Sequence, residues 1–220
     1  MVIIIVLLLV YFFLPTLYFK FKYFINRSKK GNVIYLTFDD GPSVYTEKLL
    51  NLLKKYQVKA SFFCVGQFAL KYPEIIEEMK NDGHLIGLHS LSHKNYLLMR
   101  SNKTKQDFFE SLIIMHNLGV KVNYFRPPWG HLSWWGWMFI IKYQLKPIFW
   151  HVMASDWKDI SVSQIKENLL KKIRGGDIIC LHDGRGTNEA PARTIEALEE
   201  VIPLLKKKGY VFERVDFFEK

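Results

Sequence analysis

Four short runs of this sequence carry side chains that could hydrolyse a bond with activated water. They are residues 37–41 (Thr-Phe-Asp-Asp-Gly), 89–93 (His-Ser-Leu-Ser-His), 126–130 (Arg-Pro-Pro-Trp-Gly) and 181–183 (Leu-His-Asp). Each run alone is a weak signal, but most of them directly follow an apolar segment typical of a buried strand. Together an acidic pair, a histidine pair, an arginine and a late histidine could hold a cation and move protons.

The candidate metal ligands are Asp40, His89 and His93. The histidines are four residues apart, so a helical turn would place both on one face with Cβ atoms about 5–6 Å apart. Two histidines and one carboxylate, with open positions, are typical of an ion that activates water. Zinc is the default ion, and cobalt, nickel or iron would suit the same ligands. Taken singly, a histidine pair is often a polar patch and Asp-Asp-Gly-Pro an ordinary turn.

The other polar residues could carry protons. If Asp40 binds the metal, Asp39 is free to act as a base, and His182 can act as an acid because imidazole titrates near neutral pH. Arg126 could hold Asp39 ionised, and Asp156 could keep His182 protonated. The alternative for Arg126 and Asp156 is a structural ion pair between strand ends, which is partly compatible with these roles.

Strand-like and helix-like segments alternate after residue 31, which predicts a parallel sheet covered by helices. The expected strands are residues 33–38, 61–65, 85–89, 123–126, 147–152, 177–182 and 211–215. The expected helices are residues 45–56, 67–81, 103–118, 133–143, 163–174 and 192–208.

Polar residues at or just past the ends of these strands favour an α/β fold with a distorted (β/α) barrel of seven or eight units, in which strand ends meet at one mouth. An open doubly wound sheet is the alternative, but its glycine-rich phosphate loop is absent. The residues at strand ends are Asp39, Asp40, His89, Arg126, Asp156 and His182.

The first thirty residues predict a membrane anchor. Residues 2–19 carry no charge, and as a helix they would be about 27 Å long, near the thickness of a bilayer core. We therefore expect a single-pass transmembrane helix within residues 1–30, followed by one catalytic domain over 31–220. A cleaved signal peptide is the alternative, but a basic start and a small-residue cleavage site are both missing.

Positive charge is concentrated just after this segment. The net charge is +10, and no acidic residue precedes residue 31. The basic cluster would be attracted to anionic lipid, and no nucleic-acid-binding module accompanies it, so we expect no nucleic-acid partner. Positive charge beside a membrane span tends to stay in the cytoplasm, which would keep the domain on the cytoplasmic side. An enzyme that acts on a cell wall must lie on the outer side, so the side of the membrane stays open. The cluster consists of Lys20, Lys22, Arg27, Lys29 and Lys30.

We expect the protein to be a monomer.

The two cysteines, Cys64 and Cys180, lie in apolar strand-like runs. That position predicts buried thiols, with neither a disulfide framework nor a metal knuckle.

In these motifs the chain resembles the NodB-homology polysaccharide deacetylases, carbohydrate esterase family four, over roughly residues 31–216. Residues 37–41 match that family's T-F-D-D-G, 89–93 match H-[ST]-x-x-H, and 126–130 match R-x-P-[YW]-G. Residues 150–157 match W-x-V-x-x-x-D-W, and 182–183 match the end of L-x-H-D.

The resemblance implies a divalent metal, usually zinc, on Asp40, His89 and His93. It implies that Asp39 is the general base, oriented by Arg126, and that His182 is the general acid, tuned by Asp156. The backbone N–H of Trp129 would help to hold the oxyanion, and Pro128 and Leu181 would lie at the substrate. The implied reaction hydrolyses the N-acetyl group of an amino sugar to a free amine and acetate.

Two positions depart from the family pattern. Met153 stands where the family often has an aspartate, and Cys180 stands where a leucine usually lines the acetyl-methyl pocket. These changes leave the acyl and substrate preference open, because neither removes a proton carrier or metal ligand.

Residues 133–141 contain three tryptophans in four positions, Trp134, Trp135 and Trp137. Aromatic side chains stack on sugars and also suit a bilayer interface, while packing against the barrel accounts for part of the cluster. The first expected substrate is therefore an N-acetylated polysaccharide such as peptidoglycan. The second is an amino sugar carried on a polyprenyl-phosphate lipid. A non-catalytic sugar-binding protein is disfavoured, because the predicted base, acid and metal ligands are all kept.

Overall fold

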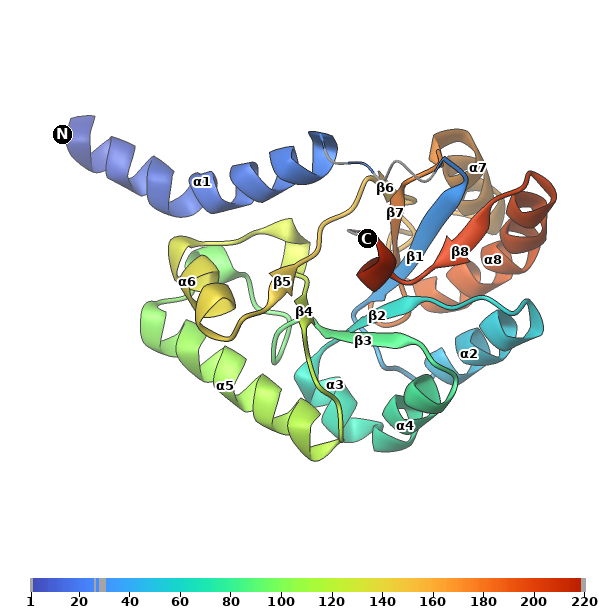
Figure 1. Cartoon of the computed structure of the whole chain (residues 1–220), viewed down its shortest axis with the longest axis horizontal. Helices are drawn as coiled ribbons and strands as arrows, with labels where there is room; N and C mark the ends of the chain where they lie inside the picture. The colour runs from blue at the N-terminus through green and yellow to red at the C-terminus, as the bar shows by residue number, and fades with distance from the viewer. Residues whose placement is uncertain (1, 26, 28–30, 219–220) are drawn as a thin grey trace.

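The computed structural model describes residues 2–25, 27 and 31–218, and it describes the side chains of these residues except for 2–9 and 12. Its strands form one sheet in the order β5-β4-β3-β2-β1-β7-β6, with β8 paired to β1 off this path (Figure 1). Every strand pair in the described sheet is parallel, as the alternation predicted. The strands are β1 (Val33–Asp39), β2 (Ser61–Cys64), β3 (Leu85–Leu88), β4 (Tyr124–Phe125), β5 (Lys146–Pro147), β6 (Val152–Met153), β7 (Ile178–His182) and β8 (Val211–Glu213).

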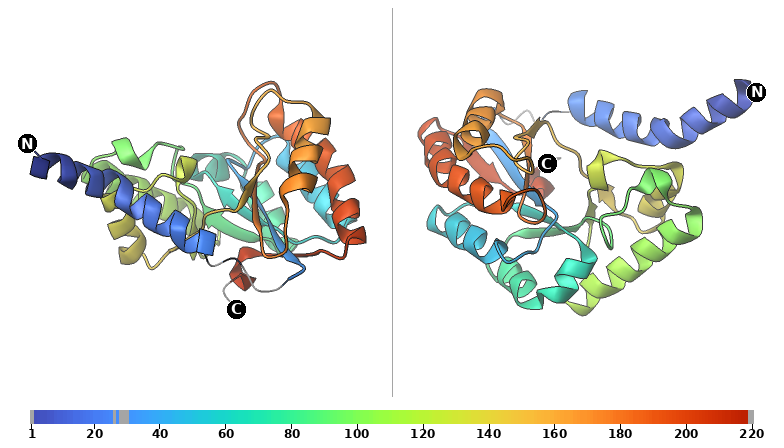
Figure 2. Two further views of the ribbon diagram at one scale, coloured as in Figure 1. Left: turned by 90° about the horizontal axis from the view of Figure 1, so that it is seen from above. Right: turned by 180° about the vertical axis from the view of Figure 1, so that it is seen from behind.

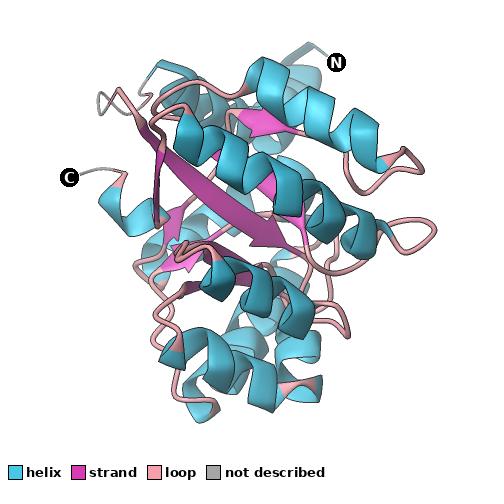
Figure 3. Cartoon of the chain, turned by 90° about the vertical axis from the view of Figure 1, so that its right-hand side faces the viewer, coloured by secondary structure: helices cyan, strands magenta, loops and turns pink. Residues whose placement is uncertain are grey.

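The central strand β1 is buried at every residue after Val33. It pairs with β8 along its first half, with β2 along its second half, and with β7 from Tyr35 to Asp39. A strand that is buried along its length and mostly apolar, apart from Thr37 and its acidic end, is expected where helices cover both faces of a parallel sheet. Figure 3 shows the strands enclosed by helices in this way.

The helices lie outside the curled sheet (Figure 2). One predicted helix, residues 67–81, is wrong, because the structure has two helices that meet at Pro73. Proline has no N–H to continue a helix and disfavours helical geometry in the residue before it, and Tyr72 accordingly has φ −128°. The helices after the first are α2 (Thr46–Lys55), α3 (Gly66–Lys71), α4 (Pro73–Asn81), α5 (Ser101–Asn117), α6 (Trp134–Lys142), α7 (Val162–Lys172) and α8 (Ala190–Lys207).

The sheet curls like a distorted barrel but does not close. The predicted strand over residues 147–152 is instead two short strands, β5 and β6, at opposite ends of the sheet path. Among the described residues no ladder joins them. Between them, the carbonyls of Ile148 and Phe149 accept hydrogen bonds from the Arg126 guanidinium at 3.3 and 3.4 Å. These two carbonyl groups therefore bond to the buried Arg126 side chain and not to a neighbouring strand.

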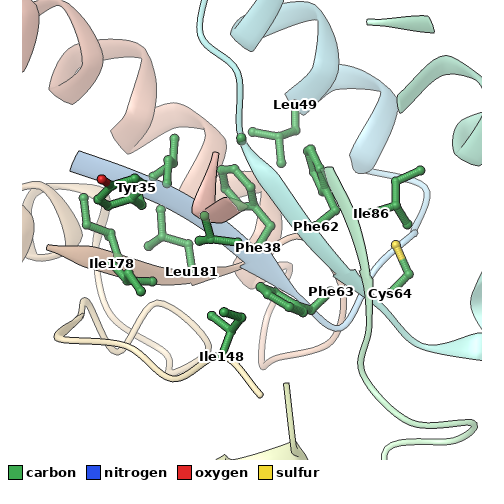
Figure 4. Packing of buried hydrophobic residues seen from close by; sticks show 14 of the residues in the cluster. Tyr35, Phe38, Leu49, Phe62, Phe63, Cys64, Ile86, Ile148, Ile178 and Leu181 are labelled. Carbon is green, nitrogen blue, oxygen red and sulfur yellow. The ribbon is translucent and has the colours of Figure 1, made fainter. Parts of the chain in front are cut away.

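The core lies between the sheet and its helices (Figure 4). Phe38 of β1 stacks on Phe62 of β2, with ring centroids 5.2 Å apart, and both rings are fully buried. Leu49 of α2 packs over this pair from the helix layer. Both cysteines are buried and unpaired, as the sequence predicted.

The N-terminal segment forms helix α1 (Val2–Ile25), which contacts α6 (Figure 2). Thr16 exchanges hydrogen bonds with the backbone of Leu132, at 2.7 Å from its N–H and 3.1 Å to its carbonyl. The Tyr23 hydroxyl donates to the carbonyl of Pro147 at 2.8 Å. Across the described residues, no helix has the length and apolar character needed to cross a membrane. Residues 1, 26 and 28–30 of the predicted anchor lie outside the described residues.

Candidate active site

The polar strand ends meet at one pocket of about 470 Å³. Asp39 ends β1, His182 ends β7, and His89 and Arg126 directly follow β3 and β4. Asp156 follows β6 after two residues. Parallel strands place their carboxyl ends at the same edge of a sheet, and the predicted gathering of these residues is confirmed. Asp39 and His182 line the pocket, while Arg126 and Asp156 lie buried behind them.

Asp40, His89 and His93 form a group that could hold a metal ion. The Nε2 atoms of His93 and His89 lie 3.0 and 3.4 Å from Asp40 Oδ1. This oxygen is buried without a hydrogen-bond partner among the described residues, as expected of an atom that serves a cation. Ligands of tetrahedral zinc lie at similar separations, roughly 3.3 Å apart. Burial favours the neutral acid, but the neighbouring imidazoles of His89 and His93 outweigh it and hold the pKa of Asp40 well below its usual range.

The histidine pair is placed by a loop, so the predicted helical turn is wrong. Residues 89–93 follow β3 without forming a helix, and both Ser90 (φ 73°) and His93 (φ 57°) are left-handed. The His93 backbone N–H donates to Ser90 Oγ at 2.7 Å. These two reversals bring the rings of His89 and His93 to a centroid distance of 5.1 Å.

His89 is fixed in one orientation. Its Nδ1 lies 2.7 Å from the carbonyl oxygen of Arg126, and because a carbonyl can only accept, that nitrogen carries the proton. The lone pair of Nε2 then faces Asp40. A hydrogen bond of this kind on the far nitrogen typically orients a metal-binding histidine.

Asp39 has a different partner from Asp40. Arg126 Nη1 donates to Asp39 Oδ1 at 2.8 Å and to Thr37 Oγ1 at 2.7 Å. The guanidinium is fully buried and lies over the ring of Phe63, 4.2 Å from its centroid. Two adjacent carboxylates therefore have different surroundings, one among histidines and one against an arginine.

His182 is held by Asp156. Its Nδ1 lies 3.0 Å from Asp156 Oδ1, and its backbone N–H donates to Oδ2 at 2.8 Å. Thr194 Oγ1 also donates to Oδ2, at 3.1 Å. Burial opposes the charged imidazolium, but the charge and hydrogen bond of Asp156 outweigh it and raise the pKa of His182 to about 9. The alternative ion pair between Arg126 and Asp156 is wrong, because each pairs with another residue.

The predicted substrate residues do not all reach the pocket. Trp129 lines it, is half-exposed and has a left-handed backbone (φ 55°). Pro128 is buried and outside the lining. Leu181 also lies outside the lining and packs in the core beside Phe38. Side chains alternate along a strand, so Cys180 and His182 face the pocket while Leu181 faces away.

Asp183, the last residue of the run 181–183, is a supporting residue for which no role was predicted. Its Oδ2 accepts a hydrogen bond from Thr46 Oγ1 at 2.7 Å, and its carbonyl accepts one from Ser43 Oγ. A Cβ on Gly41 would lie only 2.1 Å from that Oδ2. Burial raises the pKa of Asp183 to about 7, although the Thr46 hydrogen bond opposes this. Asp183 therefore packs directly beneath the turn that carries Asp39 and Asp40, and its position next to His182 was the available signal.

Known proteins share both the sequence and the fold. A family model described as polysaccharide deacetylase matches residues 26–134. A peptidoglycan-N-acetylglucosamine deacetylase of Bacillus cereus is 32% identical over 195 residues, which cover 88% of this chain and 70% of that protein.

Two solved structures extend the similarity to three dimensions. The Bc1960 peptidoglycan N-acetylglucosamine deacetylase, in complex with a naphthalenyl N-oxidanyl-benzamide, superposes with a TM-score of 0.81 at 30% identity, over 87% of this chain and 90% of its own. A family 4 carbohydrate esterase from Streptomyces lividans, in complex with acetate, gives 0.76 at 26%, over 84% and 93%. This chain therefore belongs to the polysaccharide deacetylases, the NodB-homology hydrolases of carbohydrate esterase family four.

Proposed function

We propose that this deacetylase removes acetyl groups from N-acetylated amino sugars of peptidoglycan. The observation that carries the proposal is the different pairing of two adjacent carboxylates. Asp40 lies among His89 and His93, while Asp39 pairs with Arg126 at 2.8 Å. This division supplies one carboxylate for a metal and one for a proton. The printed activity of the B. cereus relative supports the choice of glycan.

Asp40, His89 and His93 would hold the cation, and zinc is the ion we propose. When bound, such a cation acts as a Lewis acid toward the amide carbonyl and the attacking water. Asp39, whose carboxylate is oriented by the hydrogen bond from Arg126, takes the proton of that water. His182 gives a proton to the amide nitrogen through Nε2, since Nδ1 is held by Asp156. The C–N bond breaks, and acetate and a free amine leave.

The pocket walls support a sugar substrate. Trp129, Trp150 and Trp157 all line the pocket, and flat indole faces suit stacking on a sugar ring. We also propose that the Trp129 backbone N–H donates to the developing oxyanion. Trp129 lines the pocket beside a candidate metal ligand, with its ring centroid 4.3 Å from that of His93.

The direct test is acetate release from N-acetylated chito-oligosaccharide and from purified glycan strands. Asp39→Asn and His182→Ala are expected to lower turnover by a factor of about 10² or more while the protein stays folded. Asp159→Asn, an exposed aspartate, is the matched control. Chelation should abolish activity, and zinc or cobalt should restore it. Wild-type turnover in either variant, or full activity in protein shown by elemental analysis to lack metal, would refute the proposal.

A second candidate is deacetylation of an amino sugar carried on a membrane lipid. An apolar strip on α1 favours it, since Leu17, Phe21 and Phe24 lie on one helix face and are 61%, 65% and 79% exposed. Met138 and Ile141 extend the exposed apolar surface on the neighbouring α6. Apolar side chains beside basic residues are typical of helices that lie on a bilayer surface. We propose that this strip associates with the membrane.

Helix α1 is also close to the loop that carries the pocket tryptophan. A Cβ on Gly130 would lie 3.4 Å from Cε of Lys20, the residue before Phe21. A lipid-borne substrate could therefore reach the pocket from the side of α1.

Vesicles distinguish these candidates. The full chain, transferred from detergent, should sediment with anionic vesicles, and the triple change Leu17→Ser, Phe21→Ser, Phe24→Ser should reduce binding by about tenfold or more. Val211→Ser on β8 removes an exposed apolar residue elsewhere and is the control. If the triple variant loses turnover only on the lipid-borne sugar, the second candidate holds. If it loses none and still binds vesicles, both the lipid-borne substrate and the membrane strip are refuted.

A further inference from the structure

A second group of metal-binding side chains lies next to the first. Asp39, Cys180 and His182 each offer one ligand atom, and these atoms all lie within 4.8 Å of one another. All three residues line the same pocket. None of them belongs to the first group, although Asp39 Oδ2 is only 4.0 Å from His89 Nε2. The pocket therefore holds two neighbouring sets of ligands.

The free atoms of the second group face one another because their other atoms are occupied. Asp39 Oδ1 accepts from Arg126, and His182 Nδ1 pairs with Asp156. This leaves Asp39 Oδ2, Cys180 Sγ and His182 Nε2. The thiol lies 3.3 Å from Asp39 Oδ2. In a tetrahedral zinc site, a sulfur and an oxygen ligand lie roughly 3.5 Å apart, so a cation could bind with little movement.

Sulfur makes this group different in chemical preference from the first. Asp40, His89 and His93 offer only oxygen and nitrogen, whereas Cys180 adds a thiolate. Binding of a cation at this group displaces two protons to solvent, one from the thiol and one from His182 Nε2. Thiolates favour soft and borderline ions such as zinc and cadmium over magnesium or calcium. The cysteine also stands where the family usually has a leucine, which could not bind an ion at all.

We propose that Asp39, Cys180 and His182 form a second, inhibitory site for a thiophilic divalent cation, with zinc as the natural ligand and cadmium as a probe. An ion bound there engages the carboxylate that serves as the base and the imidazole that serves as the acid. Hydrolysis then stops although the first site is filled. The inhibition rests on the proposed function, whereas the binding itself does not.

Binding is tested first, on the full chain freed of metal. Equilibrium dialysis against cadmium should give two ions per wild-type chain, and the ultraviolet absorption of a cadmium thiolate should appear with the second. Cys180→Ala should bind one ion and show no thiolate absorption, and Cys180→Ser provides a second variant of nearly native size. Cys64→Ala, which removes the other buried thiol, is the matched control and should behave as wild type.

Several results would overturn the site. A single ion in the wild type is one, and thiolate absorption that persists in Cys180→Ala is another. Loss of that absorption in a folded Cys64→Ala protein would show that Cys64, and not Cys180, is the thiolate ligand. Circular dichroism of each variant shows that it is folded before its binding is compared.

Activity then tests the inhibition. Wild-type turnover should rise with the first equivalent of zinc and fall as more is added. Each variant is compared with its own maximal rate, and in Cys180→Ala the zinc concentration that halves this rate should rise about tenfold or more. An unchanged concentration refutes the inhibitory role. If the protein hydrolyses no acetylated sugar, the proposed function fails, while the two-ion stoichiometry still decides the site.

Discussion

Arg126 and Asp39 form an ion pair in the interior of the protein, with Nη1 2.8 Å from Oδ1 and the guanidinium fully buried. A charge in such surroundings is costly without its partner. The pair joins the loop after β4 to the end of β1. It therefore contributes to the stability of the fold as well as to the placement of the carboxylate.

Removing one partner should cost more than removing both. Arg126→Met leaves a buried carboxylate unpaired and should lower the free energy of unfolding by about 3–5 kcal/mol. The double variant Arg126→Met, Asp39→Asn should be more stable than the sum of the single changes implies, because neither charge remains. Urea denaturation of the four proteins measures this, and additive losses would show that the two residues are not coupled. All three variants should be inactive.

The pH dependence of hydrolysis should report His182. Its pKa is raised to about 9, so the acid is protonated below that pH and is lost as the pH rises through it. The rate should therefore fall on the alkaline side near pH 9. In Asp156→Asn the main stabilising charge is gone, and this decline should move down by about one pH unit or more. The measurement is the pH profile of kcat/KM, with Asp159→Asn as control. If the alkaline decline of Asp156→Asn stays at the wild-type pH, Asp156 does not raise the pKa of His182.

Gly41 should tolerate no side chain. A Cβ there would lie 2.1 Å from Asp183 Oδ2, so Gly41→Ala must displace either the buried aspartate or the turn that carries Asp39 and Asp40. We expect a loss of at least about 2 kcal/mol in unfolding free energy, together with most of the activity. Gly31→Ala is the control, because no atom lies within 4 Å of its added methyl group. Equal stability of the two variants, measured by denaturation, would show that the turn adjusts freely.

His84 should make the protein sensitive to acid. It is buried, and its Nδ1 accepts a hydrogen bond from the Ala60 N–H at 3.1 Å. Burial lowers the pKa of His84 to about 4, whereas an unfolded histidine titrates near 6.5. Its contribution to stability is fully present above the unfolded pKa and is lost as the pH falls from about 6.5 to 4, on the order of 3 kcal/mol.

His84→Asn keeps a neutral acceptor and should remove most of that pH dependence. The measurement is the difference in unfolding free energy between about pH 7 and pH 4.5, a window that the shift itself defines. His116→Asn, on the exposed face of α5, should behave as wild type. The same acid sensitivity in His84→Asn would assign the effect to another group.

Most of the fold could be predicted from the sequence because its signals are local. The apolar runs that became β1, β2, β3 and β7 are nearly all buried, and short apolar runs between amphipathic segments identify such strands. The position of Asp39 and His182 at strand ends then followed from the geometry of parallel sheets. The prediction missed the break at Pro73, although proline is a local signal for it.

The remaining features depend on contacts between distant residues. β5 and β6 are separate because Arg126 takes the carbonyls of Ile148 and Phe149, and no local pattern indicates this. The left-handed backbone at Ser90 and His93 is rare for residues other than glycine and is maintained by the surrounding structure.

Whether Cys180 or Leu181 lines the pocket depends on which of the two neighbouring side chains points toward it. Both residues are apolar and lie in one short strand, so only the alternation along the folded β7 decides which of them lines the pocket.

The pocket is lined by the carboxyl-terminal parts of strands and by the connections that follow them, and this leaves the opposite end of the sheet free for engineering. The connections at residues 56–60, 82–84 and 208–210, which precede strands, contribute no residue to its lining. Gly209 even has open space where a side chain would begin. New chain termini or an inserted reporter domain at 208–210 would lie remote from the chemistry, so this end offers a place to tag or split the enzyme while its reaction is still observed.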